Sequence, residues 1–309
     1  MKIAFVFPGQ GSQAVGMMSG FAAHPVVRET FAEASDALGE DLWALVESGP
    51  QDQLSLTTNT QPVMLTAGVA AWRAWRASGG PQPSVVAGHS LGEYTALVAA
   101  GVLAFRDAVP LVRFRAQAMQ QAVPAGQGAM AAIMGADDGA VVSACAEAEQ
   151  GQVCEAVNFN APGQVVIAGH KEAVERAIPL AKLKGAKRGV MLPVSAPFHS
   201  SLLRPAADQL AAKLAGVAIA SPSIAVIHNV DVAQHRDPAQ IREALARQAA
   251  SPVHWTATIL AMADMGVTHL VECGPGKVLA GLTRRIKEGI PAYALTDSDA
   301  IAATMKELQ

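Results

Sequence analysis

The 309-residue chain is long enough for one large domain that carries a smaller inserted one, and this length excludes a mini-protein that needs disulfides to fold. With 51% hydrophobic and 16% charged residues, it can fill a sizeable core and lacks the polar excess of disordered chains. The formal net charge of −3 provides no global positive field for nucleic acid or a membrane, and three cysteines without disulfide or metal-ligand spacing favour a reducing cytoplasm.

Short apolar runs predict strands that are buried on both faces of a parallel sheet. They cover residues 3–7, 84–87, 224–227 and 269–272. Between them, stretches such as 63–77 and 106–122 have apolar positions spaced three and four apart, which is typical of helices packed on a sheet. Alternating strands and helices predict a doubly wound α/β fold.

The middle of the chain predicts a different module. Its expected order is strand 129–134, helix 137–148, strands 153–159 and 164–168, helix 171–184 and strand 189–194. This β-α-β-β-α-β order is typical of a ferredoxin-like subdomain. We therefore expect an insertion at residues 124–195 in a large domain formed by residues 1–123 and 196–309.

Residues 88–92 read Gly-His-Ser-Leu-Gly, between a predicted buried strand and a predicted helix at 93–100. Two glycines permit the sharp turn that would hold Ser90 exposed at the carboxyl end of the sheet. The helix N-terminus and the Leu91 N–H would then point at an oxygen that develops negative charge. A nucleophilic serine is favoured over an incidental serine in a turn.

A serine nucleophile needs a base, and the chain has eight histidines. His89 is expected to point away from Ser90, and those at 170, 228 and 269, in or beside strands, are expected to be structural. His199 lies in a loop that leaves a strand, where catalytic residues concentrate, and is the best candidate. No acid stands out as a third member.

Two glycine-rich turns invite competing interpretations. Residues 9–14 fit a relaxed dinucleotide fingerprint, but no second strand ending in an acidic residue follows at the required distance. Gly9 and Gly11 could instead let the N–H of Gln10 approach a ligand oxygen. Residues 274–277 lack the spacing of a phosphate loop and are expected to form a strand-to-helix turn near the site.

Two arginines, Arg113 and Arg115, fall within a largely apolar helical stretch. Burying either one unpaired would be costly, so we expect a buried arginine here to find a carboxylate. The alternative is an exposed arginine whose stem covers apolar surface.

Several motifs together resemble the malonyl-CoA:acyl carrier protein transacylases of bacterial fatty-acid synthesis, over nearly the whole chain. In chain order they are FPGQGSQ (7–13), GHSLGE (88–93), Arg115, PFHS (197–200), NVD (229–231), Gln248 before SPV (251–253), and ECGPGKVL (272–279). That family pairs a hydrolase-like α/β domain with a ferredoxin-like insertion, in agreement with the predicted elements.

The resemblance implies a role for each matched residue. Ser90 would be the acylated nucleophile, His199 its base and Arg115 the clamp for the malonyl carboxylate, with Gln10 and Leu91 as oxyanion donors. Gln248 would orient the histidine through its backbone carbonyl. The matched positions expected to line the site are Gln61, Asn160, His89 and Phe198, the last of which would disfavour methylmalonyl.

The implied reaction transfers malonyl from malonyl-CoA to an acidic acyl carrier protein, with no cofactor or metal and with the enzyme expected to be a monomer. Two basic clusters could meet the carrier protein: Lys182, Lys184, Lys187 and Arg188, and Arg284, Arg285 and Lys287. Three alternatives stay open: a serine esterase, a non-catalytic malonyl-binding module, and the malonyl transferase subunit of a malonate decarboxylase.

Overall fold

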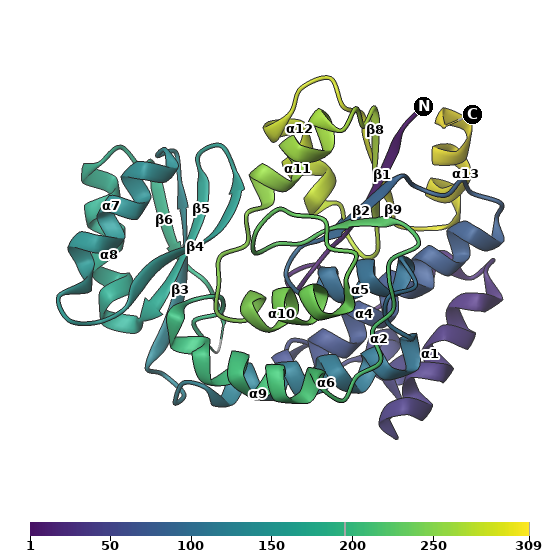
Figure 1. Cartoon of the computed structure of the whole chain (residues 1–309), viewed down its shortest axis with the longest axis horizontal. Coiled ribbons are helices and arrows are strands. Elements are labelled where there is room, and N and C mark those ends of the chain that lie inside the picture. Colours follow the sequence, from purple (N-terminus) through teal and green to yellow (C-terminus); the bar gives the residue numbers. More distant parts are fainter. Residues whose placement is uncertain (195, 309) are drawn as a thin grey trace.

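The computed structural model describes residues 1–194 and 196–308 as two sheets with helices packed on both (Figure 1). Residue 195, the last residue of the predicted insertion, lies outside the described part. The fold is the predicted one: a hydrolase-like parallel α/β sheet that carries a ferredoxin-like subdomain. Both chain ends lie on the large domain, at the side away from the inserted module.

The large sheet has five strands, all parallel to their neighbours. In spatial order they are β7 (Ala225–Ile227), β2 (Val85–Gly88), β1 (Ile3–Phe7), β8 (His269–Cys273) and β9 (Ala292–Leu295). The strands predicted at 3–7, 84–87, 224–227 and 269–272 are confirmed within one residue at each end, and β9 was not predicted. Their carboxyl ends form the edge of the sheet where ligands bind in open α/β folds.

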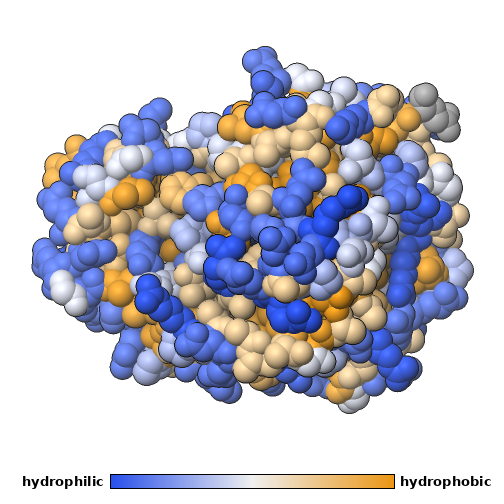
Figure 2. All heavy atoms as spheres, viewed as in Figure 1, coloured by the Kyte–Doolittle hydropathy of each residue, from blue (hydrophilic) through white to orange (hydrophobic). Residues whose placement is uncertain are grey.

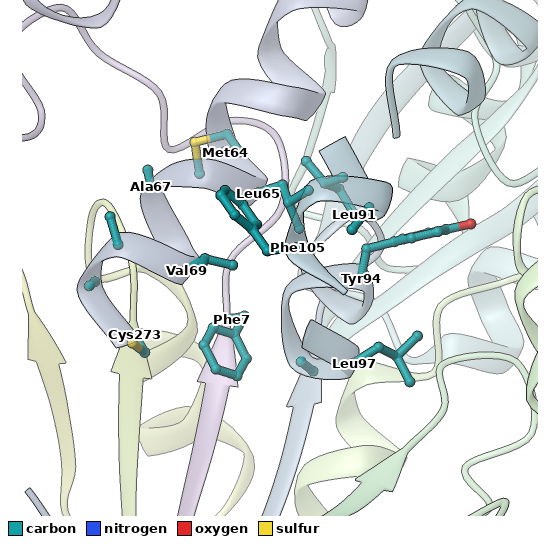
Figure 3. Packing of buried hydrophobic residues seen from close by; sticks show 14 of the residues in the cluster. Phe7, Met64, Leu65, Ala67, Val69, Leu91, Tyr94, Leu97, Phe105 and Cys273 are labelled. Carbon is teal, nitrogen blue, oxygen red and sulfur yellow. The ribbon is translucent and has the colours of Figure 1, made fainter. Parts of the chain in front are cut away.

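Helices cover both faces of this sheet because successive residues of β1 point to opposite sides. Phe5 and Phe7 pack into one core, and Ala4 and Val6 pack into a second one. Figure 3 shows Phe7 at the end of β1 with Val69 of α4 beside it. This two-sided burial explains the unbroken apolar run.

The first core is formed with α1 (Pro25–Leu38), α2 (Leu42–Ser48), α3 (Gln51–Leu54), α4 (Thr57–Ala77), α5 (Gly92–Ala99), α6 (Phe105–Gln121), α9 (Arg204–Leu214), α10 (Pro238–Gln248) and α13 (Ser298–Glu307). The second core is formed with α11 (Trp255–Asp264) and α12 (Val278–Ile286). Two 3-10 turns, η1 (Ser19–Phe21) and η2 (Ser201–Leu203), complete the large domain.

The inserted subdomain has the predicted element order. It contains β3 (Gly128–Met134), α7 (Asp138–Glu149), β4 (Cys154–Ala161), β5 (Gln164–His170), α8 (Lys171–Leu183) and β6 (Arg188–Met191), in an antiparallel sheet of spatial order β4-β5-β3-β6. One sheet face packs on α7 and α8. The other packs against the end of α6 and the segment around Phe198, which places it beside the large domain.

Four predicted boundaries differ from the structure by two residues or more, and one of them is the end of β5, which lies at His170 rather than at residue 168. The last strand ends at Met191 rather than Val194, because Pro193 carries no N–H to continue the ladder. Strand β4 runs on to Ala161, so the β4–β5 turn is Pro162-Gly163. Helix α4 begins at Thr57, six residues before the predicted start. The prediction missed its first turns because they bury polar side chains, so that this stretch of the sequence shows no apolar periodicity.

Candidate active site

Ser90 occupies a strained turn between β2 and α5. Its backbone has a φ of 53°, a left-handed conformation that a side chain rarely adopts. The turn is tight: a Cβ atom added to Gly88 would lie 1.8 Å from the backbone of Gly92, and one added to Gly92 would lie 2.1 Å from the carbonyl oxygen of Phe7. Glycine is therefore required at both positions, and the Ser90 side chain projects into a cavity at the end of the sheet.

His199 reaches this serine from a segment 109 residues further along the chain. Its Nε2 lies 2.7 Å from the Oγ of Ser90, and its Nδ1 lies 2.9 Å from the backbone carbonyl oxygen of Gln248. The carbonyl oxygen can only accept a hydrogen bond, so Nδ1 carries the ring proton and donates it, which leaves Nε2 free to accept the serine proton. A backbone carbonyl at the end of α10 thus occupies the place of a triad acid.

The electrostatics of the site keep this imidazole neutral. Burial, and after it the positive charge of Arg115, lower the pKa of His199 to about 3, although the hydrogen bond to the carbonyl of Gln248 acts in the opposite direction. A histidine with this pKa is unprotonated at neutral pH and can act as a base.

Arg115 lies on α6 and is almost completely buried. Its guanidinium donates to the side-chain oxygens of Gln61 and Gln248, each at 2.8 Å, and lies 3.3 Å from the Oγ of Ser90. Burial lowers its pKa. Among the described residues, no carboxylate forms an ion pair with this guanidinium, so an anion that enters the cavity would meet a charge without a direct counter-charge.

Within the described part of the chain, one of the two arginines has a carboxylate partner and the other does not. Arg113, two residues earlier, forms an ion pair with Glu40 at 2.6 Å at the surface. Arg115 faces amide oxygens, because α6 turns its side chain toward the cavity rather than toward an acidic neighbour.

Two backbone N–H groups lie near the serine. The loop after β1 approaches the turn so closely that a Cβ on Gly9 would lie 2.5 Å from the carbonyl oxygen of His89. Neither the N–H of Gln10 nor that of Leu91 donates a hydrogen bond to another described residue. Their use as an oxyanion hole stays a prediction.

A cavity of about 200 Å³ surrounds Ser90 and His199. Its other lining residues are Gln10, His89, Arg115, Met119, Met130, Asn158, Asn160, Val166, Leu192, Val194 and Phe198. Of the predicted lining residues, His89 bonds Asn160 at 2.8 Å, Phe198 borders the cavity, and Gln61 lies behind Arg115 rather than in the wall. The ring of His89 also lies 5.4 Å from that of Trp255, and burial lowers its pKa.

A second, open groove of about 880 Å³ shares Gln10, Leu192 and Val194 with the cavity. The start of α4 and the loop after β6 form its other walls.

Three residues of the site were missed in the sequence. Glu93, directly after the elbow, is a fully buried carboxylate that bonds Gln248, and Asn229 accepts a hydrogen bond from the Ser90 N–H at 2.7 Å. The ring of Tyr94 lies 5.5 Å from the guanidinium carbon of Arg115. Glu93 and Asn229 lie in the motifs GHSLGE and NVD, and these motifs were the available signals, since no periodicity predicts burial of a charge.

The basic clusters lie apart from the cavity. Lys182, Lys184, Lys187 and Arg188 are exposed on the outer side of the inserted subdomain, where Lys184 pairs with Glu147 at 3.1 Å. Arg284 donates to the carbonyl of Ala292, and Arg285 donates to Gln164 and to the carbonyl of Pro162.

Within residues 1–194 and 196–308, no group of three His, Cys, Asp or Glu side chains is arranged to hold a metal ion. In the same residues, no helix combines the length and apolar character needed to cross a membrane.

On the face shown in Figure 2, hydrophilic side chains gather over α10, and apolar residues are scattered between them.

A family model described as acyl transferase domain matches residues 4–306. The chain is 56% identical over 306 residues to the malonyl CoA-acyl carrier protein transacylase of Escherichia coli strain K12, which covers 99% of both chains. It is similar to the crystal structure of an acyl-carrier-protein S-malonyltransferase from Burkholderia pseudomallei, with 62% identity, a TM-score of 0.98, and coverage of 99% of this chain and 100% of the other. A malonyl-transacylase solved with a type II PKS acyl-carrier protein matches at 51% identity and a TM-score of 0.98, with coverage of 99% and 100%.

Proposed function

Because the chain belongs to the acyl transferase family, among the malonyl CoA-acyl carrier protein transacylases, we propose that Ser90 carries the malonyl group from malonyl-CoA to the thiol of an acyl carrier protein. The observation that carries this assignment is the placement of Ser90, His199 and the buried Arg115 around one cavity. A serine and a base alone would suit an esterase. A buried cation beside them suits an acyl group that itself carries a carboxylate.

In the first half-reaction, the Oγ of Ser90 attacks the thioester carbon while its proton moves to the Nε2 of His199. The carbonyl oxygen becomes an oxyanion, which the N–H groups of Gln10 and Leu91 would stabilise. The carbon–sulfur bond then breaks, and the CoA sulfur takes the proton from His199. Malonyl-Ser90 remains.

In the second half-reaction, the same groups work in the opposite direction. The pantetheine thiol of the carrier protein gives its proton to His199 and attacks the malonyl ester. The Oγ of Ser90 leaves with that proton, which restores the free enzyme. One base serves both steps because the carbonyl of Gln248 fixes its ring in one orientation.

The other assignments are proposals that accompany this one. Residues 124–195 are the inserted subdomain and residues 1–123 and 196–309 the large domain. No cofactor takes part, since each bond change above needs only the malonyl thioester, the thiol of the carrier protein, Ser90 and His199. A cytoplasmic location is supported by Cys145, Cys154 and Cys273, all of which are free and buried.

Intact-mass measurement after mixing with malonyl-CoA tests the proposal. The parent chain should gain the mass of one malonyl group and lose it when carrier protein is added. Ser90→Ala should gain nothing and lose transfer by a factor on the order of 10⁶, the loss known for a serine protease whose nucleophile is removed. Acylation of the Ser90→Ala variant would show that another residue is the nucleophile.

A further inference from the structure

Glu93 is a fully buried carboxylate on the first turn of α5, and no arginine or lysine among the described residues pairs with it. Its oxygens accept three hydrogen bonds, from the Nδ1 of His228 at 2.7 Å, the N–H of Asn229 at 3.0 Å and the Nε2 of Gln248 at 2.9 Å. A carboxylate so far from water persists only when donors surround it. The site chemistry described above does not use this residue.

The partners of Glu93 are themselves bonded to the site. Asn229 accepts from the N–H of Ser90 at 2.7 Å and donates to the carbonyl of Gly88 at 2.7 Å, which braces the strained elbow. Gln248 accepts from Arg115 through its side chain and from His199 through its backbone. A single intermediate residue, Asn229 or Gln248, therefore links Glu93 to the nucleophile, the base and the arginine.

The orientation of the Gln248 amide follows from this arrangement. An ionised carboxylate only accepts hydrogen bonds, so the NH₂ end of the amide must face Glu93, where it also meets the carbonyl oxygen of Ser90 at 2.9 Å. The oxygen end then has one remaining direction, toward the guanidinium of Arg115 at 2.8 Å. With a hydrogen-bond donor in place of the carboxylate, the amide would be free to turn its NH₂ group toward the cation.

We propose that Glu93 is a positioning residue for carboxylate recognition, a role that rests on the proposed function. It holds the Gln248 amide so that the amide oxygen faces Arg115. The amide thus lies between the guanidinium and the carboxylate of Glu93, and the two charges do not touch each other. Because an amide rather than a carboxylate touches Arg115, the guanidinium remains free to pair with the carboxylate of an incoming malonyl group.

The test compares malonyl-CoA with acetyl-CoA, which lacks the carboxylate. Glu93→Gln should lower kcat/KM for malonyl-CoA relative to acetyl-CoA by about tenfold or more, the effect of one misplaced charge-assisted hydrogen bond. Glu272→Gln is the matched control, because Glu272 is equally buried but bonds the N–H of Ala280 rather than the site. It should leave the malonyl-to-acetyl ratio unchanged.

A double-mutant comparison separates this role from general support of the fold. In an Arg115→Ala background, Glu93→Gln should no longer change the ratio, because the group through which Glu93 acts is missing. Gln248→Met, which removes the amide and keeps the backbone carbonyl, should lower the ratio as Glu93→Gln does and provides a second test if the latter does not fold.

Each outcome decides the matter. An unchanged ratio in Glu93→Gln, or in Gln248→Met when the first variant does not fold, overturns the positioning role while leaving malonyl transfer by the parent intact. An equal change with and without Arg115 also overturns it. A parent chain that takes up no malonyl group overturns the proposed function itself, and the role of Glu93 with it.

Discussion

At the scale of single residues, the site depends on two buried basic groups, and a positive charge on one disfavours a positive charge on the other. His199 is held neutral by burial and by the nearby cation, while Arg115 is buried without a direct carboxylate partner. The free energy of ionisation of each group therefore depends on the charge of the other and on the presence of an anionic ligand.

Acidification should affect His199 in a defined range of pH. Its folded pKa of about 3 lies below the ordinary value of 6.5, so the unfolded chain binds more protons between these values. The free energy of unfolding should fall as pH drops below 6.5 and continue to fall toward 3. His199→Gln should flatten this part of the curve, measured by urea unfolding at several pH values, and identical slopes for both chains would contradict the assignment.

Arg115→Ala should reduce malonyl transfer far more than acetyl transfer. A malonyl carboxylate would then enter a partly closed site unpaired, at a cost of roughly 3 to 5 kcal/mol. Steady-state rates with the two CoA thioesters measure the difference. Equal losses for both substrates would make Arg115 a structural residue.

At the scale of elements, the β4–β5 hairpin links the two sheets at the site. The N–H of Phe159 donates to the carbonyl of Val253 in the large domain at 3.0 Å, and the turn is held by Arg285 of α12. From the same hairpin, Asn160 contacts His89 beside the nucleophile. The inserted subdomain thus supplies one wall of the cavity, and hydrogen bonds join its hairpin to the large domain at Val253 and at Arg285.

Arg285→Ala should loosen this wall. The loss of its hydrogen bonds should lower transfer to carrier protein and to free pantetheine together, by roughly two- to tenfold, because the hairpin touches the site rather than the partner. Parallel assays with the two thiol acceptors provide the measurement. A loss confined to carrier protein would instead assign Arg285 to docking.

At the scale of the whole molecule, a slightly acidic enzyme is proposed to meet an acidic carrier protein, so attraction must come from local basic patches. Lys287 is exposed at the end of α12, and Lys182 is exposed on the far side of the inserted subdomain. The two clusters are thus separable by mutation.

Lys287→Glu should raise KM for carrier protein, with an effect that shrinks as salt is added, and should leave transfer to free pantetheine near normal. Lys182→Glu carries the same charge change in the other cluster. If Lys182→Glu alone raises KM, the docking surface lies on the inserted subdomain, and if neither variant does, both clusters are solvated faces.

The sequence by itself determined the features that neighbouring residues encode. A buried apolar run before Gly88 and a helix after Gly92 sufficed for the elbow, and the order of periodic segments sufficed for both modules. Local conformation depends on nearby residues, so motif and periodicity carry it.

Tertiary structure alone decided which distant groups meet. The carbonyl that orients His199 belongs to a residue 49 positions away, and a backbone oxygen carries no signature of its own in the amino-acid sequence, so before the structure only the family resemblance pointed to Gln248. The amide oxygens around Arg115 come from positions 54 and 133 residues distant, and the buried Glu93 gains its donors from residues 135 to 155 positions further on. Those contacts arise only when α5, α6 and α10 converge at the carboxyl end of the sheet, because a hydrogen bond depends on distance in space and not on separation along the chain.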